Sequence, residues 1–127
     1  MRVRYHECDG QGIVFNANYL VYADICGVEL ERELFGSHDA FIAHGVETVV
    51  AEANVKFRAP ARFDDELVVS AYVTHLGTTS LVFEYEITRG DEVLAVAVLR
   101  YVFIDPATFT KTPPPEAVRK AYADVLR

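Results

Sequence analysis

The sequence predicts an α+β fold in which one long buried helix packs against a single curved antiparallel sheet. Apolar residues recur at helical spacing over one long stretch near the N-terminus, and the period changes to two after Gly45. The later strands are joined by short turns, and strands linked by hairpins pair as antiparallel neighbours. One helix on one face of such a sheet is an α+β arrangement. With 127 residues, 51% of them hydrophobic, we expect one domain, residues 1–127.

The chain opens with a segment, residues 1–6, in which apolar and polar side chains alternate. Val3 and Tyr5 fall on one face of it, which predicts a short half-buried strand. A polar loop that contains two glycines, residues 7–15, comes next. Glycine adopts backbone conformations closed to other residues, so this loop can bring its backbone close to a ligand.

The long helix is predicted from about Tyr19 to Leu34. Its apolar residues recur at spacings of three and four, and its first half is apolar nearly all round, as is typical of a helix buried on most sides. Asn16 and Asn18 are candidates to cap its start. Gly27 costs about 1 kcal/mol of helix propensity relative to alanine, so we expect the backbone of the sheet to approach closely there.

Four longer strands are predicted in residues 46–58, 66–75, 81–89 and 93–104. The last is the most apolar and is therefore expected to be central. A C-terminal helix is predicted over residues 116–126. One helix leaves a sheet edge and part of a sheet face uncovered, and a dimer that continues the sheet would cover them.

Composition excludes several classes of function. Twelve Lys and Arg residues against nineteen Asp and Glu residues give a net charge of −7, which argues against a nucleic-acid partner. No apolar run approaches the roughly 18 residues of a membrane span, and no signal peptide is expected. Cys8 and Cys26 are too few for a disulfide framework, so we expect reduced thiols and a cytoplasmic location. No His or Cys spacing indicates a metal site.

Asp9 is the candidate catalytic residue, because it is an acid on a glycine-rich loop that leads directly into a buried helix. The free N–H groups at a helix start can stabilise a developing negative charge, so an acid facing them suits acyl transfer. The carboxylate, ionised at neutral pH, can act as a nucleophile or as a general base. The alternative is a loop aspartate that only caps a turn.

Two motifs carry a resemblance to a known family. The first is Arg4-Tyr5 followed by Asp9-x-x-Gly12-Ile13-Val14-Phe15-x-x-x-Tyr19, with a further acid at Asp24. The second lies at the end of a predicted strand and spans residues 55–67, VKFRAPARFDDEL. In this order, and over nearly the whole chain, they resemble the hotdog-fold acyl-CoA thioesterases related to 4-hydroxybenzoyl-CoA thioesterase.

The resemblance implies a hotdog fold, a long central helix wrapped by a curved five-stranded antiparallel sheet. It implies homodimers with a continuous sheet that assemble into homotetramers, and active sites between subunits. The implied activity is hydrolysis of a small acyl- or aroyl-CoA to free acid and CoA, without a metal or another cofactor. An acyl carrier protein conjugate is the alternative substrate.

The resemblance also implies roles for individual residues. The acid at Asp9 would attack the thioester or activate water, and the main-chain N–H groups of Phe15 and Asn16 would polarise the carbonyl. The candidate substrate-binding residues are Gly12, Val14, Asn18, Tyr19 and Asp24. For Asn18, Tyr19 and Asp24 the alternatives are a helix cap, core packing and a structural hydrogen bond or ion pair.

Coenzyme A carries phosphates, which require basic and hydroxyl groups near the cleft. The candidates are Arg58, Arg62, Thr78, Thr79, Ser80, Arg89 and Lys111, each of which is alternatively a solvated surface residue.

One position departs from the family pattern, since Asn16 stands where many relatives carry histidine and the hydroxybenzoyl enzymes tyrosine. Asparagine supplies the same main-chain N–H.

Two other functions compete with hydrolysis. A non-catalytic protein that binds acyl-CoA or acyl carrier protein would have no need of Asp9. A hotdog hydratase would carry an Asp/His pair on a different loop, and no such pair is visible in this sequence.

Overall fold

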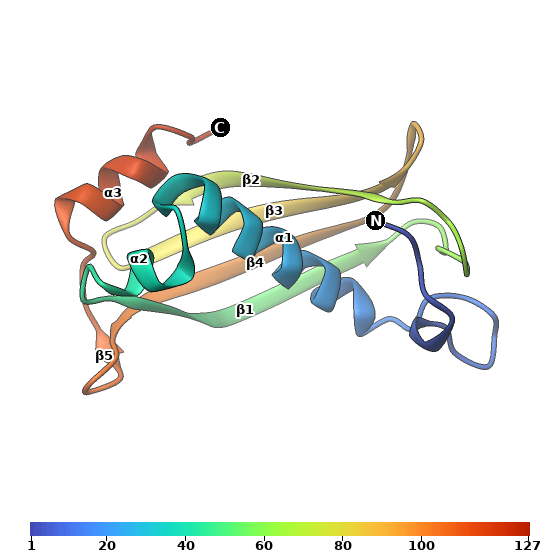
Figure 1. The fold of residues 1–127 in the computed structure, drawn as a ribbon, viewed down its shortest axis with the longest axis horizontal. Helices are drawn as coiled ribbons and strands as arrows, with labels where there is room; N and C mark the ends of the chain where they lie inside the picture. Colours follow the sequence, from blue (N-terminus) through green and yellow to red (C-terminus); the bar gives the residue numbers. More distant parts are fainter.

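The computed structural model describes residues 1–127 and confirms the α+β fold class (Figure 1). One long helix, α1 (Asn18–Phe35), lies across one face of a five-stranded antiparallel sheet. The strands are β1 (Glu47–Phe57), β2 (Val68–Leu76), β3 (Ser80–Arg89), β4 (Glu92–Asp105) and β5 (Thr110–Lys111). The shorter helices are η1 (Tyr5–Glu7), α2 (His38–Ile42) and α3 (Glu116–Ala123). None of the helices combines the length and the apolar character that crossing a membrane requires.

The long strands lie in the order β1-β4-β3-β2, with β5 paired to β4. The central position of β4 confirms the prediction from its apolar sequence. Hairpins join β2 to β3 and β3 to β4, but β1 and β2 form opposite edges of the sheet, so the predicted hairpin between them is wrong. Residues 58–67 instead cross the end of the sheet, because this connection contains Pro60 and is too long for a tight turn.

The N-terminal segment does not form the predicted strand over residues 1–6. Val3 is buried and exchanges main-chain hydrogen bonds with the loop before β2, but only one isolated bridge results. Tyr5, predicted on the same apolar face, is 79% exposed. The chain leaves the extended conformation because the Glu7 carboxylate accepts a hydrogen bond from Arg4 N, 2.7 Å away, and closes the turn of η1. The fifth strand of the sheet is therefore β5.

Helix α1 matches its predicted extent but not its predicted cap. Ala17 occupies the N-cap position without a side-chain hydrogen bond, so neither Asn16 nor Asn18 caps the helix. The Asn18 side chain donates instead to the main-chain oxygen of Glu7, 2.8 Å away. At the other end Gly36, with a φ of +94°, stops the helix in a conformation that favours glycine.

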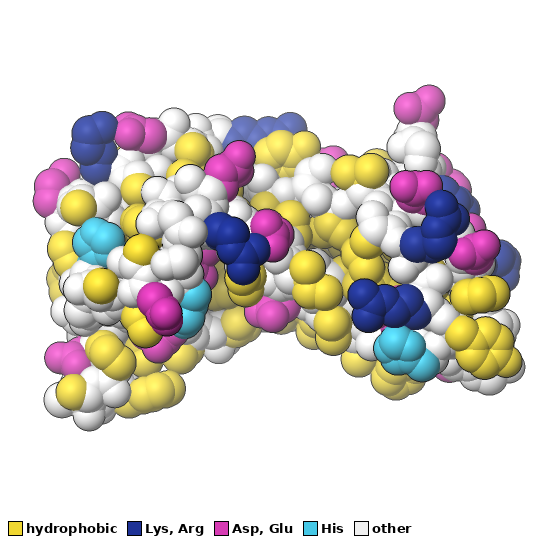
Figure 2. All heavy atoms as spheres, in the orientation of Figure 1, with side chains coloured by type: hydrophobic (Ala, Val, Ile, Leu, Met, Phe, Trp, Pro, Cys, Tyr) yellow, Lys and Arg dark blue, Asp and Glu magenta, His cyan; other side chains and the backbone are white.

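The outer side of α1 is uncovered in the single chain. Tyr19, Tyr22 and Ala23 face the sheet and are buried. Four apolar side chains of the same helix are between 36% and 51% exposed: Leu20, Val21, Ile25 and Val28. Figure 2 shows hydrophobic side chains at the surface of this face of the molecule. The prediction that the first half is buried on most sides is thus wrong for one chain alone.

The core has two parts at opposite ends of the sheet. One contains Phe41, Phe103 and Tyr122 and lies beneath α2 and α3. The other contains Tyr19 and Tyr22 of α1 together with residues from the N-terminal segment and from the connection between β1 and β2. The candidate site lies at this second end.

Gly27 allows a side chain, not the sheet backbone, to approach α1. A Cβ atom at this position would lie 2.6 Å from the Tyr85 hydroxyl oxygen, which itself hydrogen bonds with the Tyr101 hydroxyl at 2.7 Å. The expectation of a close approach was correct, but the partner is a buried tyrosine of β3.

Gly27→Ala is expected to destabilise the protein, because overpacking a core typically costs about 1–3 kcal/mol. The gain in helix propensity, about 1 kcal/mol, offsets only part of this cost. Urea unfolding of four proteins measures it: the parent, Gly27→Ala, Tyr85→Phe and the double variant. Removing the hydroxyl should relieve the clash, so the double variant should be more stable than the sum of the single effects. A Gly27→Ala protein more stable than the parent would contradict the clash.

Candidate active site

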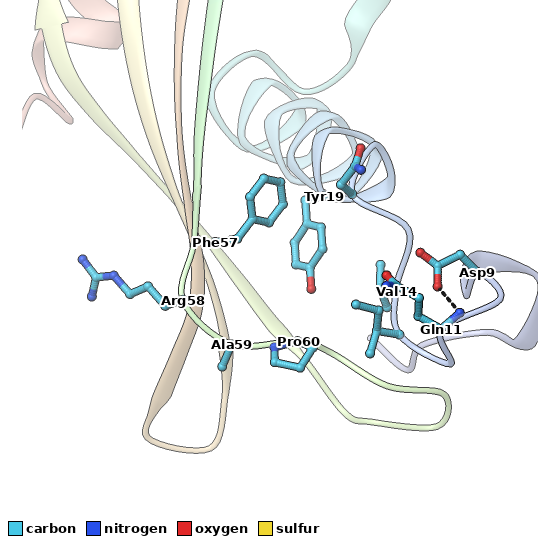
Figure 3. Close-up of a pocket in the computed structure, with 10 residues that line it drawn as sticks. Asp9, Gln11, Val14, Tyr19, Phe57, Arg58, Ala59 and Pro60 are labelled. Atoms are coloured by element: carbon cyan, nitrogen blue, oxygen red, sulfur yellow. Dashed lines mark hydrogen bonds between the residues drawn. The ribbon is translucent and has the colours of Figure 1, made fainter.

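A cavity of about 350 Å³ opens where the Asp9 loop, the start of α1 and the end of β1 meet (Figure 3). Five of its ten lining residues are hydrophobic. The lining residues are Asp9, Gln11, Ile13, Val14, Asn16, Tyr19, Phe57, Arg58, Ala59 and Pro60. The cavity therefore joins the two motifs that are far apart in the sequence.

The Asp9 loop is held by main-chain hydrogen bonds. Asp9 N donates to Ile13 O at 2.9 Å, and Val14 N donates to Ala61 O at 2.8 Å. Gly12 turns the chain back with a φ of +76°, in the region that favours glycine. These bonds fix the loop to the residues that follow β1 and so place Asp9 beside the cavity.

The Asp9 carboxylate has one bonded and one free oxygen. Oδ1 accepts a hydrogen bond from Gln11 N at 2.8 Å, so Asp9 does cap a turn, as the alternative interpretation predicts. The side chain is only half-buried, and its other oxygen accepts no hydrogen bond and turns toward the start of α1 (Figure 3). Capping the turn therefore leaves one oxygen available for chemistry.

The helix start offers different N–H groups from those predicted. Phe15 N donates to Glu7 O at 2.9 Å, so the expectation that this N–H is free is wrong. The N–H groups of Asn16 and Ala17 have no acceptor within the chain. Asn16 also lines the cavity with Asp9. Ala17 was missed by sequence reasoning, although the first N–H groups of any helix lack partners inside it.

The predicted substrate-binding residues divide into two groups. Val14 and Tyr19 line the cavity, and Tyr19 is also buried core, with its hydroxyl accepting from Ala61 N at 3.1 Å. Gly12 and Asn18 do not line it.

Asp24 does not lie in this cavity. It lines a separate cavity of about 200 Å³ on the β1 side of α1, together with Tyr85 and Tyr101. Its side chain is exposed and forms no ion pair in the chain, so it needs none of the partners expected for a buried carboxylate.

Two of the seven candidate CoA-binding residues lie near Asp9. Arg58 lines the cavity, and its side chain extends away from Asp9 (Figure 3). Arg62 is exposed, and its main chain pairs with that of Ile13 on the Asp9 loop as an isolated antiparallel β-bridge. Residues 78–80 and Lys111 lie at the opposite end of the sheet (Figure 1).

Arg89 is occupied by partners within the chain. Its guanidinium lies 2.7 Å from carboxylate oxygens of both Glu92 and Asp65. These hydrogen bonds, to Glu92 first and to Asp65 second, raise the pKa of Arg89 above its ordinary value. It also donates to Pro60 O, and so holds the connection between β1 and β2 in place.

Five lining residues are not among the candidate site residues named from the sequence: Gln11, Ile13, Phe57, Ala59 and Pro60. The signal that could have identified the last two is the motif at residues 55–67, whose first half supplies this wall. None of the four histidines lines the cavity, and no group of three or more His, Cys, Asp or Glu side chains is placed to hold a metal ion.

The chain is similar to known proteins in both sequence and structure. A family model described as the thioesterase superfamily matches residues 11–96. The acyl-CoA thioester hydrolase YbgC of Escherichia coli is 34% identical over 107 residues, which cover 84% of this chain and 80% of the relative. A 1,4-dihydroxy-2-naphthoyl-CoA hydrolase of Nostoc punctiforme is 30% identical over 120 residues, covering 91% and 79%. The solved structure of a gentisyl-coenzyme A thioesterase matches with a TM-score of 0.84 and 27% identity, covering 97% of each chain.

Proposed function

Because this chain belongs to the thioesterase superfamily, has the hotdog fold and is an acyl-CoA thioester hydrolase, we propose that Asp9 is its nucleophile or general base. The main-chain N–H groups of Asn16 and Ala17 polarise the thioester carbonyl. One observation carries the proposal: Asp9, with an unbonded oxygen, and Asn16, with an unpaired N–H, line the same cavity.

Two routes lead from this geometry to free acid and thiol. As a nucleophile, the Asp9 carboxylate attacks the thioester carbon, expels the CoA thiolate and leaves a mixed anhydride that water cleaves. As a general base, Asp9 takes a proton from the water that attacks the same carbon. In both routes negative charge develops on the carbonyl oxygen. One preorganised N–H donor to such an oxyanion is typically worth about 2.7–4 kcal/mol.

The acyl group proposed for this cavity is small. Val14, Tyr19 and Phe57 give it an apolar wall, and the rings of Tyr19 and Phe57 meet edge to face at 5.2 Å. A cavity with such an apolar wall suits a short alkyl or an aryl group. Two of the similar proteins act, by their names, on hydroxylated aromatic acyl-CoA thioesters, which supports an aroyl substrate for this chain.

We place the CoA phosphates beside Arg58 and Arg62. Neither forms an ion pair within the chain, so both are available to an anion. Phosphates and thioester lie at opposite ends of the pantetheine arm, so a cation that points away from Asp9 suits the phosphates.

Arg58→Ala is expected to raise KM for acyl-CoA by about tenfold with little change in kcat, because a charge-assisted hydrogen bond contributes about 1.5–3 kcal/mol to binding. Steady-state thiol release at several salt concentrations measures it. Arg100→Ala is the matched control, because Arg100 is a further arginine without an ion pair that lines none of the cavities described above. Equal KM values for the two variants would remove Arg58 from the proposed site.

A homodimer that pairs into a homotetramer is also part of the proposal. The β2 edge is partly covered, because Met1 N donates to Leu67 O and Arg127 N to Val73 O. The β1 edge has no such cover, and its Val50 side chain is 54% exposed. A second copy on this edge and on the apolar outer side of α1 would bury both.

The two cysteines are free thiols, as suits a cytoplasmic location.

Thiol release from a panel of thioesters tests the function. The panel contains benzoyl-CoA, 4-hydroxybenzoyl-CoA, two short aliphatic acyl-CoAs and one acyl carrier protein conjugate. Release of thiol from an aroyl- or short acyl-CoA is expected, and the preferred member defines the acyl group. Binding of acyl-CoA without thiol release from any member would favour a non-catalytic binding protein.

A further inference from the structure

We propose that Glu7 and Tyr22 form a positioning pair that holds the Asp9 loop against α1 in the geometry that hydrolysis requires. This inference rests on the proposed role of Asp9. Neither Glu7 nor Tyr22 lines the cavity that contains Asp9, so both act through other residues.

The Glu7 side chain joins the N-terminal segment to the buried side of α1. Its Oε1 atom accepts one hydrogen bond from the Tyr22 hydroxyl at 3.0 Å and another from Arg4 N at 2.7 Å. Asp9 follows Glu7 by two residues. The position of Asp9 therefore depends on a carboxylate tied to a tyrosine of the helix.

The Glu7 main chain joins the same segment to the helix start. Its carbonyl oxygen accepts from Phe15 N at 2.9 Å and from the Asn18 side chain at 2.8 Å. These two donors flank Asn16 and Ala17, whose N–H groups are free. Glu7 is thus bonded to the residues on both sides of the proposed oxyanion donors. Two residues further along the chain lies Asp9, the proposed nucleophile or base.

Tyr22 is a fixed point for this arrangement. Its side chain is completely buried, and its ring centroid lies 6.1 Å from that of Tyr19, which forms part of the cavity wall. Burial first, and the hydrogen bond to Glu7 second, raise the pKa of Tyr22 well above its ordinary value. The hydroxyl remains protonated and so remains a donor to the Glu7 carboxylate, as a charge-assisted hydrogen bond requires.

The chemistry is sensitive to this link because Asp9 and the N–H donors must act on the same carbonyl group. A displacement of about 1 Å in such a site can cost about a hundredfold in rate. Apart from the Glu7 carboxylate, the bonds between the loop and α1 use main-chain atoms and the Asn18 side chain, which substitutions of the Glu7 and Tyr22 side chains leave in place. The contribution of the pair can therefore be removed selectively.

Tyr22→Phe deletes one hydroxyl and keeps the ring, and Glu7→Gln keeps an acceptor but removes the charge. In each, we expect kcat to fall about tenfold and KM for acyl-CoA to change by less than about twofold, because the cavity lining is intact. Glu7→Ala, without an acceptor, should lose more than Glu7→Gln. The Tyr22→Phe, Glu7→Gln double variant should fall no more than about twofold below the worse single variant, because both substitutions break one link.

Ser37→Ala is the control for lost stability. The Ser37 hydroxyl caps α2 by accepting from Ala40 N at 3.0 Å, at the opposite end of the molecule from Asp9. It should lower Tm as the positioning variants do, since it removes a helix cap, and leave kcat unchanged. If Tyr22→Phe and Glu7→Gln lower Tm but keep kcat, the pair is only structural and the inference is wrong.

Asp9→Asn, assayed in parallel, separates this inference from the function on which it rests. Loss of activity in Asp9→Asn with full activity in both positioning variants overturns the positioning pair alone. Full activity in Asp9→Asn overturns the role of Asp9 and the positioning pair with it. Loss in all three, with kcat and not KM affected in the positioning variants, supports both.

Discussion

Asp9→Asn is expected to lower kcat for acyl-CoA hydrolysis by about 10²–10⁴-fold, the range that a positioned general base contributes. Asparagine has the shape of aspartate, and its side-chain carbonyl can still accept from Gln11 N, the bond that holds the loop turn. The substitution therefore removes the charge and leaves the loop in place. Thiol release under saturating acyl-CoA measures kcat, and circular dichroism with thermal unfolding verifies the fold.

Asp124→Asn is the matched control for this prediction. Asp124 is an exposed acid next to α3, paired with Lys120 at 2.9 Å and distant from the cavity. Such a surface pair is worth about 0–1 kcal/mol, so stability and activity should both stay near those of the parent. If Asp9→Asn turns over as fast as this control, Asp9 only caps the turn and the catalytic assignment is wrong.

Tyr122→Ala should have the largest effect on stability, a loss of about 3–5 kcal/mol, as for other large-to-small changes at buried aromatic residues. The ring of this α3 residue lies 5.5, 6.0 and 6.1 Å from those of Phe35, Phe83 and Phe103, so it joins α3 to α1 and to two strands. The loss is a large part of the roughly 5–15 kcal/mol that stabilises a typical domain. Urea unfolding measures it.

Tyr122→Phe is the control, because it retains the ring and removes a hydroxyl that makes no hydrogen bond within the chain. It should change the free energy of unfolding by less than about 1.5 kcal/mol, as volume-conserving changes do. At low temperature, where both variants are folded, we expect kcat to match the parent, since this cluster and Asp9 lie at opposite ends of the sheet. A drop in kcat for folded Tyr122→Ala would show that the two ends are coupled.

The long elements could be predicted because their signals are local. The periodicity of three and four residues located α1, and the alternation and turns located β1 to β4. The predicted ends of these elements lie within a few residues of the ends in the structure. The apolar sequence of β4 indicated its central position. Each of these features depends only on residues that are close together in the chain.

The first half of the site was predictable for the same reason. Asp9, Val14, Asn16 and Tyr19 belong to one continuous loop and helix start, and all four line the cavity. A short contiguous segment has few ways to arrange itself, so neighbours in the sequence became neighbours in space. The family resemblance added the reaction, which no local pattern contains.

The set of elements, the fold class and the segment that carries Asp9 could be predicted from the sequence alone. Which distant segments meet is visible only in the folded structure. It placed the end of β1 opposite Asp9, set the Tyr85 hydroxyl against Gly27 and directed the Phe15 N–H to Glu7. It also left residues 78–80 at the far end of the sheet. Periodicity reports which side of an element is apolar, but the partner that covers that side is selected by packing across the whole chain.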